Sequence, residues 1–163
     1  MLKILLPVDG SQASLDAVRH ALHLRENGLS ARFVLANVQE PANLYELMTA
    51  HDPEVLQQVS DGAGEHLLAE AEALLGAAGA TWEREIASGD PGHVLAEMIE
   101  RHGVDAVVMG ARGLGAARSA VAGSVSHWLL THCAVPVTVV RHIEPDDEAD
   151  LQSDSAPARG SRP

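Results

Sequence analysis

The chain has few of the residues on which several large classes of protein depend. Lys3 is its single lysine, Cys133 is its single cysteine, and only four of its 163 residues are aromatic. A Walker-type NTPase needs a lysine inside a glycine-rich loop, and Lys3 lies at the start of the chain, so this class is excluded. One cysteine excludes an internal disulfide framework and suits a reducing compartment. Four aromatic rings are too few for a surface on which nucleic acid bases stack.

The charge is strongly negative and the apolar runs are short. Eleven basic and 23 acidic residues give a formal net charge of −12 at pH 7. This balance argues against DNA, RNA or an anionic membrane surface as the partner. No apolar run approaches the roughly 20 residues of a membrane span. The apolar start is too short for a signal peptide and ends at Asp9. We therefore expect a cytoplasmic protein with no membrane span.

Strand-like and helix-like patterns alternate along the chain. Strands are expected at Lys3–Val8, Ala31–Val38, Thr81–Ala87, Asp105–Met109 and Val135–Arg141. Apolar residues recur at helical spacing between these strands, and a short helix is expected at His127–Cys133. The third strand is the most polar, which favours a place at the edge of a sheet. The order βαβαβαβαβ predicts a doubly wound, open α/β fold with a five-stranded parallel sheet.

The composition divides the chain into one folded domain, residues 1–143, and an acidic tail, residues 144–163. A chain of 163 residues fits a single domain with its own core. The tail reads E-P-D-D-E-A-D-L-Q-S-D-S-A-P-A-R-G-S-R-P, with almost no apolar content. Such a segment buries too little apolar surface to offset the entropy of ordering it. We predict that the tail is disordered.

The most informative segment is the glycine-rich loop after the fourth predicted strand. Its fixed points are Gly110-x2-Gly113-x9-Gly123-Ser124. Glycines let backbone amides approach an anion without a Cβ in the way, and the start of the next helix offers unpaired N–H groups. Arg112 and Arg118 are the only cations of the loop and suit phosphate oxygens, although Arg118 fits a plain surface position equally well. The pattern indicates a cradle for a phosphorylated ligand.

Other nucleotide and catalytic motifs fit less well. The run Gly113–Arg118 matches G-x-G-x-x but has arginine where a dinucleotide fingerprint has its third glycine, and it follows the wrong strand. The nine histidines form no H-E-x-x-H pattern, and the serine after Gly123 lies in no G-x-S-x-G elbow. Cys133 is interpreted as a small apolar residue of the last helix. We assign no catalytic residue and no dedicated metal ligand.

The ends of the predicted strands place further residues near the loop. In an open α/β sheet, ligands bind beyond the carboxyl ends of the strands. Asp9 follows the first strand and Val38 ends the second, so both are expected to meet the glycine-rich loop in one crevice. A carboxylate such as Asp9 suits a ribose hydroxyl or a metal ion, and it also suits simple turn and cap chemistry. The loop beside it favours the ligand role.

These motifs together resemble the universal stress protein family, in its ATP-binding branch. The resemblance rests on the two-part glycine pattern, on Pro7-Val8-Asp9-Gly10-Ser11 and on Pro136-Val137-Thr138-Val139-Val140, and it covers about residues 1–142. It implies a Rossmann-like, adenine nucleotide alpha hydrolase-like fold with strand order 3-2-1-4-5. It also implies that ATP binds, together with Mg²⁺ or Mn²⁺, and that two copies pair antiparallel through the strand Val135–Arg141.

The resemblance implies a role for each matching position. Asp9 would contact the adenine or the ribose, with Pro7 and Val8 beside it, and the backbone of Val38 would pair with the adenine. The residues that would flank the ribose and the first phosphates are Met109, Gly110, Arg112 and Gly113. Those that would wrap the phosphates at the helix start are Gly123, Ser124, Val125 and Ser126.

The function that follows is regulation. The chain has no lysine clamp and no paired carboxylates beside the phosphates that would account for rapid turnover. We expect an ATP-binding stress-response protein that acts as a homodimer through a protein partner whose identity the sequence does not give. The alternative is a slow ATPase, an autophosphorylating protein or a nucleotide-dependent enzyme of the same fold, with Gln39–Pro53 supplying a substrate pocket. A module that keeps the loop only for packing fits the intact glycine pattern least.

Overall fold

The computed structural model describes residues 1–39, 53–111 and 123–142, with the side chains of the second range from residue 64 onward. Its elements are β1 (Leu2–Pro7), α1 (Gln12–Glu26), β2 (Ala31–Gln39), α3 (Pro53–Ala77), β3 (Trp82–Ser88), α4 (Pro91–His102), β4 (Ala106–Gly110), α5 (Ser124–His132) and β5 (Val137–Val140). This order confirms the predicted alternation of strands and helices. The predicted acidic tail lies outside the described residues.

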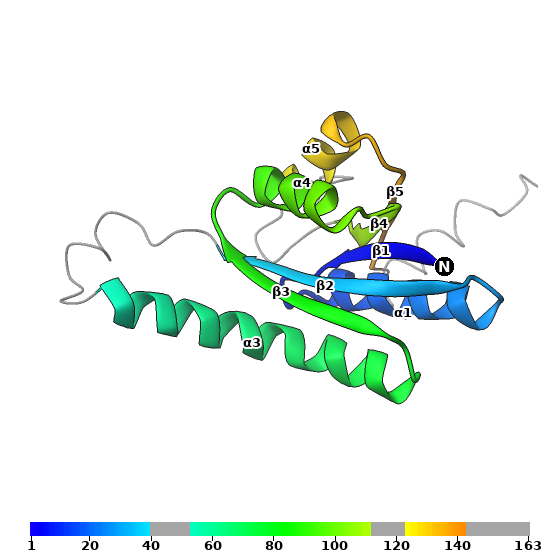
Figure 1. The fold of residues 1–163 in the computed structure, drawn as a ribbon, viewed down its shortest axis with the longest axis horizontal. Helices are drawn as coiled ribbons and strands as arrows, with labels where there is room; N and C mark the ends of the chain where they lie inside the picture. The colour runs from blue at the N-terminus through cyan, green and yellow to red at the C-terminus, as the bar shows by residue number, and fades with distance from the viewer. Residues whose placement is uncertain (40–52, 112–122, 143–163) are drawn as a thin grey trace, which may run out of the picture.

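The five strands form one parallel sheet in the order β3-β2-β1-β4-β5. Helices α1 and α3 cover one face, and α4 and α5 cover the other (Figure 1). The predicted doubly wound Rossmann-like fold and its strand order are therefore confirmed. The polar strand β3 lies at one edge, as its composition predicted, and β5 lies at the other. No helix in the described ranges is long and apolar enough to cross a membrane.

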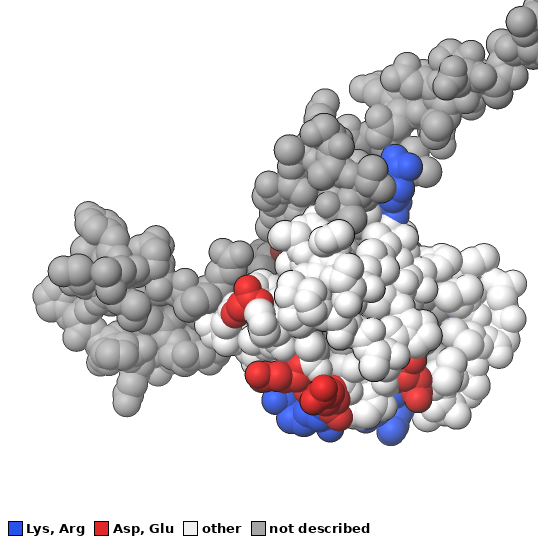
Figure 2. Space-filling model, turned by 90° about the horizontal axis from the view of Figure 1, so that it is seen from above, with Lys and Arg blue, Asp and Glu red and all other residues white. Residues whose placement is uncertain are grey.

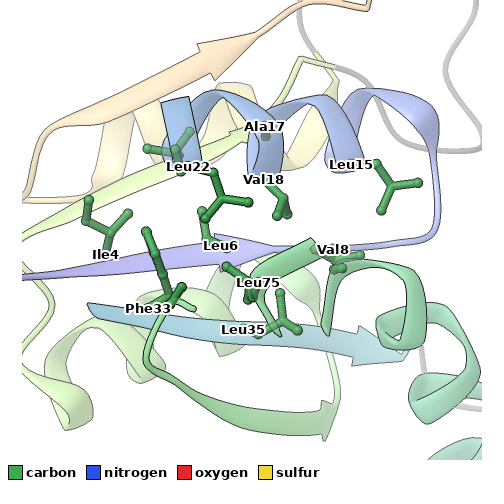
Figure 3. Packing of buried hydrophobic residues seen from close by; sticks show 14 of the residues in the cluster. Ile4, Leu6, Val8, Leu15, Ala17, Val18, Leu22, Phe33, Leu35 and Leu75 are labelled. Atoms are coloured by element: carbon green, nitrogen blue, oxygen red, sulfur yellow. The ribbon is translucent and has the colours of Figure 1, made fainter. Parts of the chain in front are cut away.

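The sheet is apolar on both faces, and residues two apart in a strand belong to the same face. In β1, Ile4 and Leu6 pack toward α1 and α3, while Leu5 packs toward α4 and α5. In β2, Phe33 and Leu35 join the first cluster, as Figure 3 shows for this side of the sheet. The two clusters explain why β1 and β2 read as nearly continuous apolar runs.

Charged side chains are unevenly distributed around this sheet. Figure 2 views the molecule from the side of α4 and α5, where the described surface is largely uncharged and the charged residues gather along one margin. Ion pairs link the elements elsewhere, for example Lys3 of β1 to Glu83 of β3 at 3.4 Å. Desolvation raises the pKa of Glu83, but Lys3 and His102 outweigh it, and the pKa of this carboxyl falls below its usual value.

Side-chain caps close the N-terminal ends of two helices. Ser11 caps α1 by accepting the Ser14 N–H at 3.2 Å, and Asp90 caps α4 by accepting the His93 N–H at 3.1 Å. Pro91 is the first residue of α4, and Gly103 closes this helix in the left-handed conformation, with φ of 59°. These side-chain acceptors satisfy amides that the helices leave unpaired.

Two predicted boundaries are wrong at the C-terminal part of the sheet. The last strand begins at Val137 and not at Val135, because Pro136 has no N–H and enters the sheet only as an acceptor, for the Val107 N–H at 2.9 Å. The last helix begins at Ser124 and not at His127, because Gly123 is its extended N-cap residue. The helix therefore starts immediately after the second half of the glycine motif.

Gly110 is the point where β4 approaches α1 most closely. A Cβ added there would lie 2.7 Å from the carbonyl carbon of Ala13 and 2.8 Å from the backbone nitrogen of Ser14. Backbone atoms cannot rotate aside as a side chain can, so the contact requires a residue without a Cβ. This glycine is thus required by packing, whatever its role toward a ligand.

Replacing Gly110 by alanine is expected to lower the free energy of unfolding by about 1–3 kcal/mol, the usual cost of overpacking. Urea denaturation of the variant measures this change. Gly76→Ala is the matched control, because its nearest neighbour is a ring carbon of Trp82 at an ordinary 3.6 Å. Alanine in this exposed helical position should raise stability by up to about 1 kcal/mol. Equal effects at the two positions would contradict the packing argument.

Candidate functional site

The start of α1 connects the ends of β1 and β4. Asp9 follows β1, and its Oδ1 accepts the backbone N–H of Ser11 at 3.0 Å. Ser11 then caps α1, whose first turn carries the Ala13–Ser14 backbone that lies against Gly110. The predicted site residues Asp9 and Gly110 are therefore brought to the same end of the sheet. The turn role of Asp9, left open by the sequence, is present in the structure.

The two ends of the glycine-rich loop meet at Ala111. The Gly123 N–H donates to the Ala111 carbonyl at 2.6 Å, and the Ala111 N–H donates to the Val140 carbonyl of β5 at 2.7 Å. These bonds place the start of α5 directly at the end of β4. Two predicted site residues, Arg112 and Gly113, lie between these ends and outside the described residues.

Ser124 and Ser126 occupy different environments, although the sequence treats them alike. The Ser126 side chain is buried, at 2% exposure, and its Oγ lies 3.0 Å from the carbonyl oxygens of both Ala111 and Gly123. A hydroxyl donates one hydrogen at a time, so it closes the base of the loop through either carbonyl. Ser124 is exposed. Of the two hydroxyls, that of Ser124 faces the solvent.

The N-terminus of α5 retains the electrostatics that suit an anion. Its N-cap residue is Gly123, which has no side chain to cap the first turn, and that turn, which includes Val125, contains no acidic residue. The first amides of a helix carry a partial positive charge. This partial positive charge contrasts with the net charge of −12 of the whole chain.

The apolar residues of the predicted site can offer a ligand their backbone groups more than their side chains. The side chains of Val8 and Met109 belong to the two core clusters, so neither is available to a ligand in solution. Pro7 and Val38 are half-buried at the ends of β1 and β2. The carboxyl ends of these strands lie at one end of the sheet because the strands are parallel.

Asn37 is a residue that the sequence analysis missed. It is 2% exposed, and its Nδ2 donates to the Val8 carbonyl at 2.7 Å, while its Oδ1 accepts from Gln39. The signal was present, because an asparagine interrupts the apolar run of β2. A buried amide needs partners on both of its polar atoms, and these partners lie at the predicted adenosine end of the crevice.

Trp128 of α5 lies against the start of α4. A Cβ added at Gly92 would be 2.9 Å from its Cδ2, and its ring stacks on His132 at a centroid distance of 4.4 Å. Cys133 is the C-cap residue that follows α5 and not a residue of the helix, and burial raises the pKa of its thiol. Within the described ranges there is no group of three or more His, Cys, Asp or Glu residues that could hold a metal ion.

The fold, together with the meeting of β4 and α5 at Ala111, defines a Rossmann-like α/β protein with a glycine-rich sequence after β4. The model of the universal stress protein family matches residues 1–141, and the chain belongs to this family. The family resemblance expected from the glycine motif is thereby confirmed. The match spans all nine helices and strands that the structure describes.

Individual relatives and solved structures show how similar the chain is to other members of the family. Universal stress protein MJ0531 of Methanocaldococcus jannaschii is 25% identical over 139 residues, which are 85% of this chain and 81% of that protein. A solved universal stress protein in complex with cAMP is 26% identical, with a TM-score of 0.59 over 85% of this chain and 95% of that one. A family protein from Arabidopsis thaliana with AMP bound has a TM-score of 0.64 at 22% identity, over 98% and 97% of the two chains.

Ser126→Ala is expected to lower the free energy of unfolding by about 1 kcal/mol, because it removes the buried hydrogen bond at the base of the loop. Ser124→Ala, two residues earlier on the same helix, should change stability by less than about 0.5 kcal/mol, since the Ser124 side chain is exposed. Parallel urea titrations of the two variants give the comparison. A Ser126 variant as stable as the Ser124 variant would show that the loop base does not depend on this hydroxyl.

Proposed function

We propose that this chain is a regulatory protein that binds ATP in the crevice at the carboxyl ends of β1, β2 and β4. The observation that carries the proposal is the meeting of β4 with α5 at Ala111, which sets an uncapped helix start beside Gly110. A glycine at the end of a parallel strand followed by a helix N-terminus is a common arrangement for phosphate. Of the alternatives, packing against α1 accounts for Gly110 alone, and no observation among the described residues favours an enzyme.

The phosphate end of the proposed site is the start of α5. Ser124, Val125 and Ser126 supply the first backbone N–H groups of the helix, and the Ser124 hydroxyl adds a donor on the solvent side. The N–H of Gly123, the N-cap residue, is bonded to Ala111, so this glycine would line the phosphates without donating to them. Arg112 and Gly113 complete this end in the proposal on the strength of the sequence motif. The family likeness to proteins solved with AMP and cAMP supports a phosphorylated adenosine as the ligand class.

The adenosine end of the proposed site is formed by Asp9 and the backbone of Val38. Asp9 follows β1 and has a carboxylate suited to a ribose hydroxyl. Val38 is the last residue but one of β2, which lies on the other side of β1 from β4. A ligand lying across the end of β1 would therefore meet the base-binding residue at one side and the phosphate-binding residues at the other.

A divalent ion, Mg²⁺ or Mn²⁺, is proposed to arrive with the nucleotide. These hard cations prefer oxygen ligands and commonly keep phosphate oxygens and waters in their shell. Asp9 is an acidic side chain at this crevice that fits such an ion. The described residues contain no preformed cluster of three metal-binding side chains, so the phosphates would supply most of the ligands.

We also propose that the protein acts as a homodimer through β5 and passes its signal to a protein partner. β5 is an edge strand, and its residues Val137, Val139 and Val140 are half-buried while Thr138 is exposed. An apolar edge with unpaired backbone groups favours pairing with another chain. Binding of ATP at the start of α5 would affect the backbone next to β5, because the Ala111 N–H donates to the Val140 carbonyl.

Two substitutions at Ser124 test the phosphate end, Ser124→Asp and Ser124→Asn. The two new side chains have the same shape and differ in charge. Ser124→Asp places a negative charge in the first turn of α5, which favours the helix itself but repels phosphate. We expect Ser124→Asp to bind ATP at least about tenfold more weakly than Ser124→Asn, which is a difference of about 1.4 kcal/mol. Isothermal calorimetry with Mg²⁺ present measures both affinities, and Trp128 fluorescence provides a second readout.

Adenosine is the internal control for this pair of variants. It has no phosphate, so the aspartate and asparagine variants should bind it equally. Equal affinities of the two variants for ATP would overturn the assignment of the phosphates to the start of α5.

A further inference from the structure

Asn37 interrupts the regular pairing of β1 and β2 where the two strands end. Alternate residues of β2 face β1, as shown by the Val8 N–H, which donates to the Ala36 carbonyl at 2.8 Å. In a parallel ladder the next bond would run from the Val38 N–H to the Val8 carbonyl. The Val8 carbonyl instead accepts from the side-chain Nδ2 of Asn37 at 2.7 Å. Among the described residues, no backbone bond joins Val38 to Val8.

Contacts with Gln39 and with Gly64 of α3 hold the Asn37 amide in this orientation. Gln39 donates to its Oδ1, which leaves Nδ2 as the atom that faces Val8. Gly64 of α3 closes over it, since a Cβ at Gly64 would lie 3.0 Å from Oδ1 and 2.8 Å from Cγ2 of Ile86. At 2% exposure, the side chain is shielded from water. The Asn37 side chain is therefore a buried part of the strand end and not a surface side chain.

We propose that Asn37 is a positioning residue for base recognition, and that its side chain takes the place of the last ladder bond so that the Val38 N–H and C=O stay open toward the crevice. This inference rests on the proposed nucleotide site. In a parallel strand the N–H and C=O of one residue point to the same side, which for Val38 is the side of β1. Because β1 has already turned away at Asp9, these two groups face the ligand position and not a neighbouring strand.

The open pair of backbone groups implies a preference for adenine over guanine. An N–H donor matches N1 of adenine, and a C=O acceptor matches its exocyclic amino group. Guanine presents a donor at N1 and an acceptor at O6, which leaves both backbone groups opposite a group of the same kind. A site built to hydrogen-bond one partner discriminates strongly against one that leaves buried polar groups unpaired.

Asn37→Leu tests this role by removing the amide while preserving its approximate volume. The Val8 carbonyl then accepts the Val38 N–H, and we expect the ratio of the ATP and GTP dissociation constants to move toward unity by at least about tenfold. Val34→Ala is the matched control, because Val34 is fully buried in the same strand and faces the other core cluster. It should lose stability yet keep the preference for ATP. An unchanged preference in Asn37→Leu would overturn the inference.

Hydrogen exchange in the free, wild-type protein tests the same point without a variant. We expect the Val38 amide to exchange at least about tenfold faster than the Ala36 amide, which is bonded in the β1–β2 ladder, and to be slowed by ATP. A Val38 amide as protected as that of Ala36 in the free protein would overturn the role of Asn37. If exchange is fast but no nucleotide binds, the proposed function fails while the open strand end stands.

Discussion

The backbone of Ala111 is the connection on which the site depends. Its carbonyl accepts the Gly123 N–H at 2.6 Å, with the Ser126 Oγ at 3.0 Å, and its N–H donates to Val140 at 2.7 Å. One residue thus joins β4, β5 and α5, and it holds together the two ends of a glycine-rich loop. This junction fixes the start of α5 at the end of β4, while Leu129 packs the rest of the helix into the core. The proposed phosphate site and the proposed dimer strand both follow from it.

The opposite side of the crevice is organised by a second buried polar contact. Asn37 holds the end of β1 to the end of β2 through the Val8 carbonyl, at 2.7 Å. At both strand ends a carbonyl that the sheet no longer pairs has a partner: the Ala111 carbonyl accepts from the Gly123 N–H, and the Val8 carbonyl accepts from the Asn37 side chain. Between them lies the start of α1, whose backbone leaves no room for a Cβ at Gly110. Hydrogen bonds of these polar groups thus hold the strand ends that border the proposed site.

Much of this arrangement could be predicted from the sequence, because apolar strands and capped helices leave strong patterns. The runs around Leu5 and Val34 were predicted correctly, and the strand order followed from the family resemblance. Tertiary bonds left weaker signals. The hydroxyl of Ser126 could cap, bind phosphate or bond to a distant carbonyl, and only the fold places it beside Ala111. Asn37 was overlooked because its partner, Val8, is 29 residues away.

The central claim is that ATP lies across the end of β1, with its base at Val38 and its phosphates at the start of α5. The most direct measurement is a titration of ¹⁵N-labelled protein with ATP and Mg²⁺, followed by amide chemical shifts. The account predicts saturable shifts concentrated at Val38, Gly110 and Gly123–Ser126, with little change at the β3 residues Trp82–Glu85. The absence of shifts at millimolar ATP, or shifts centred away from these residues, would contradict it.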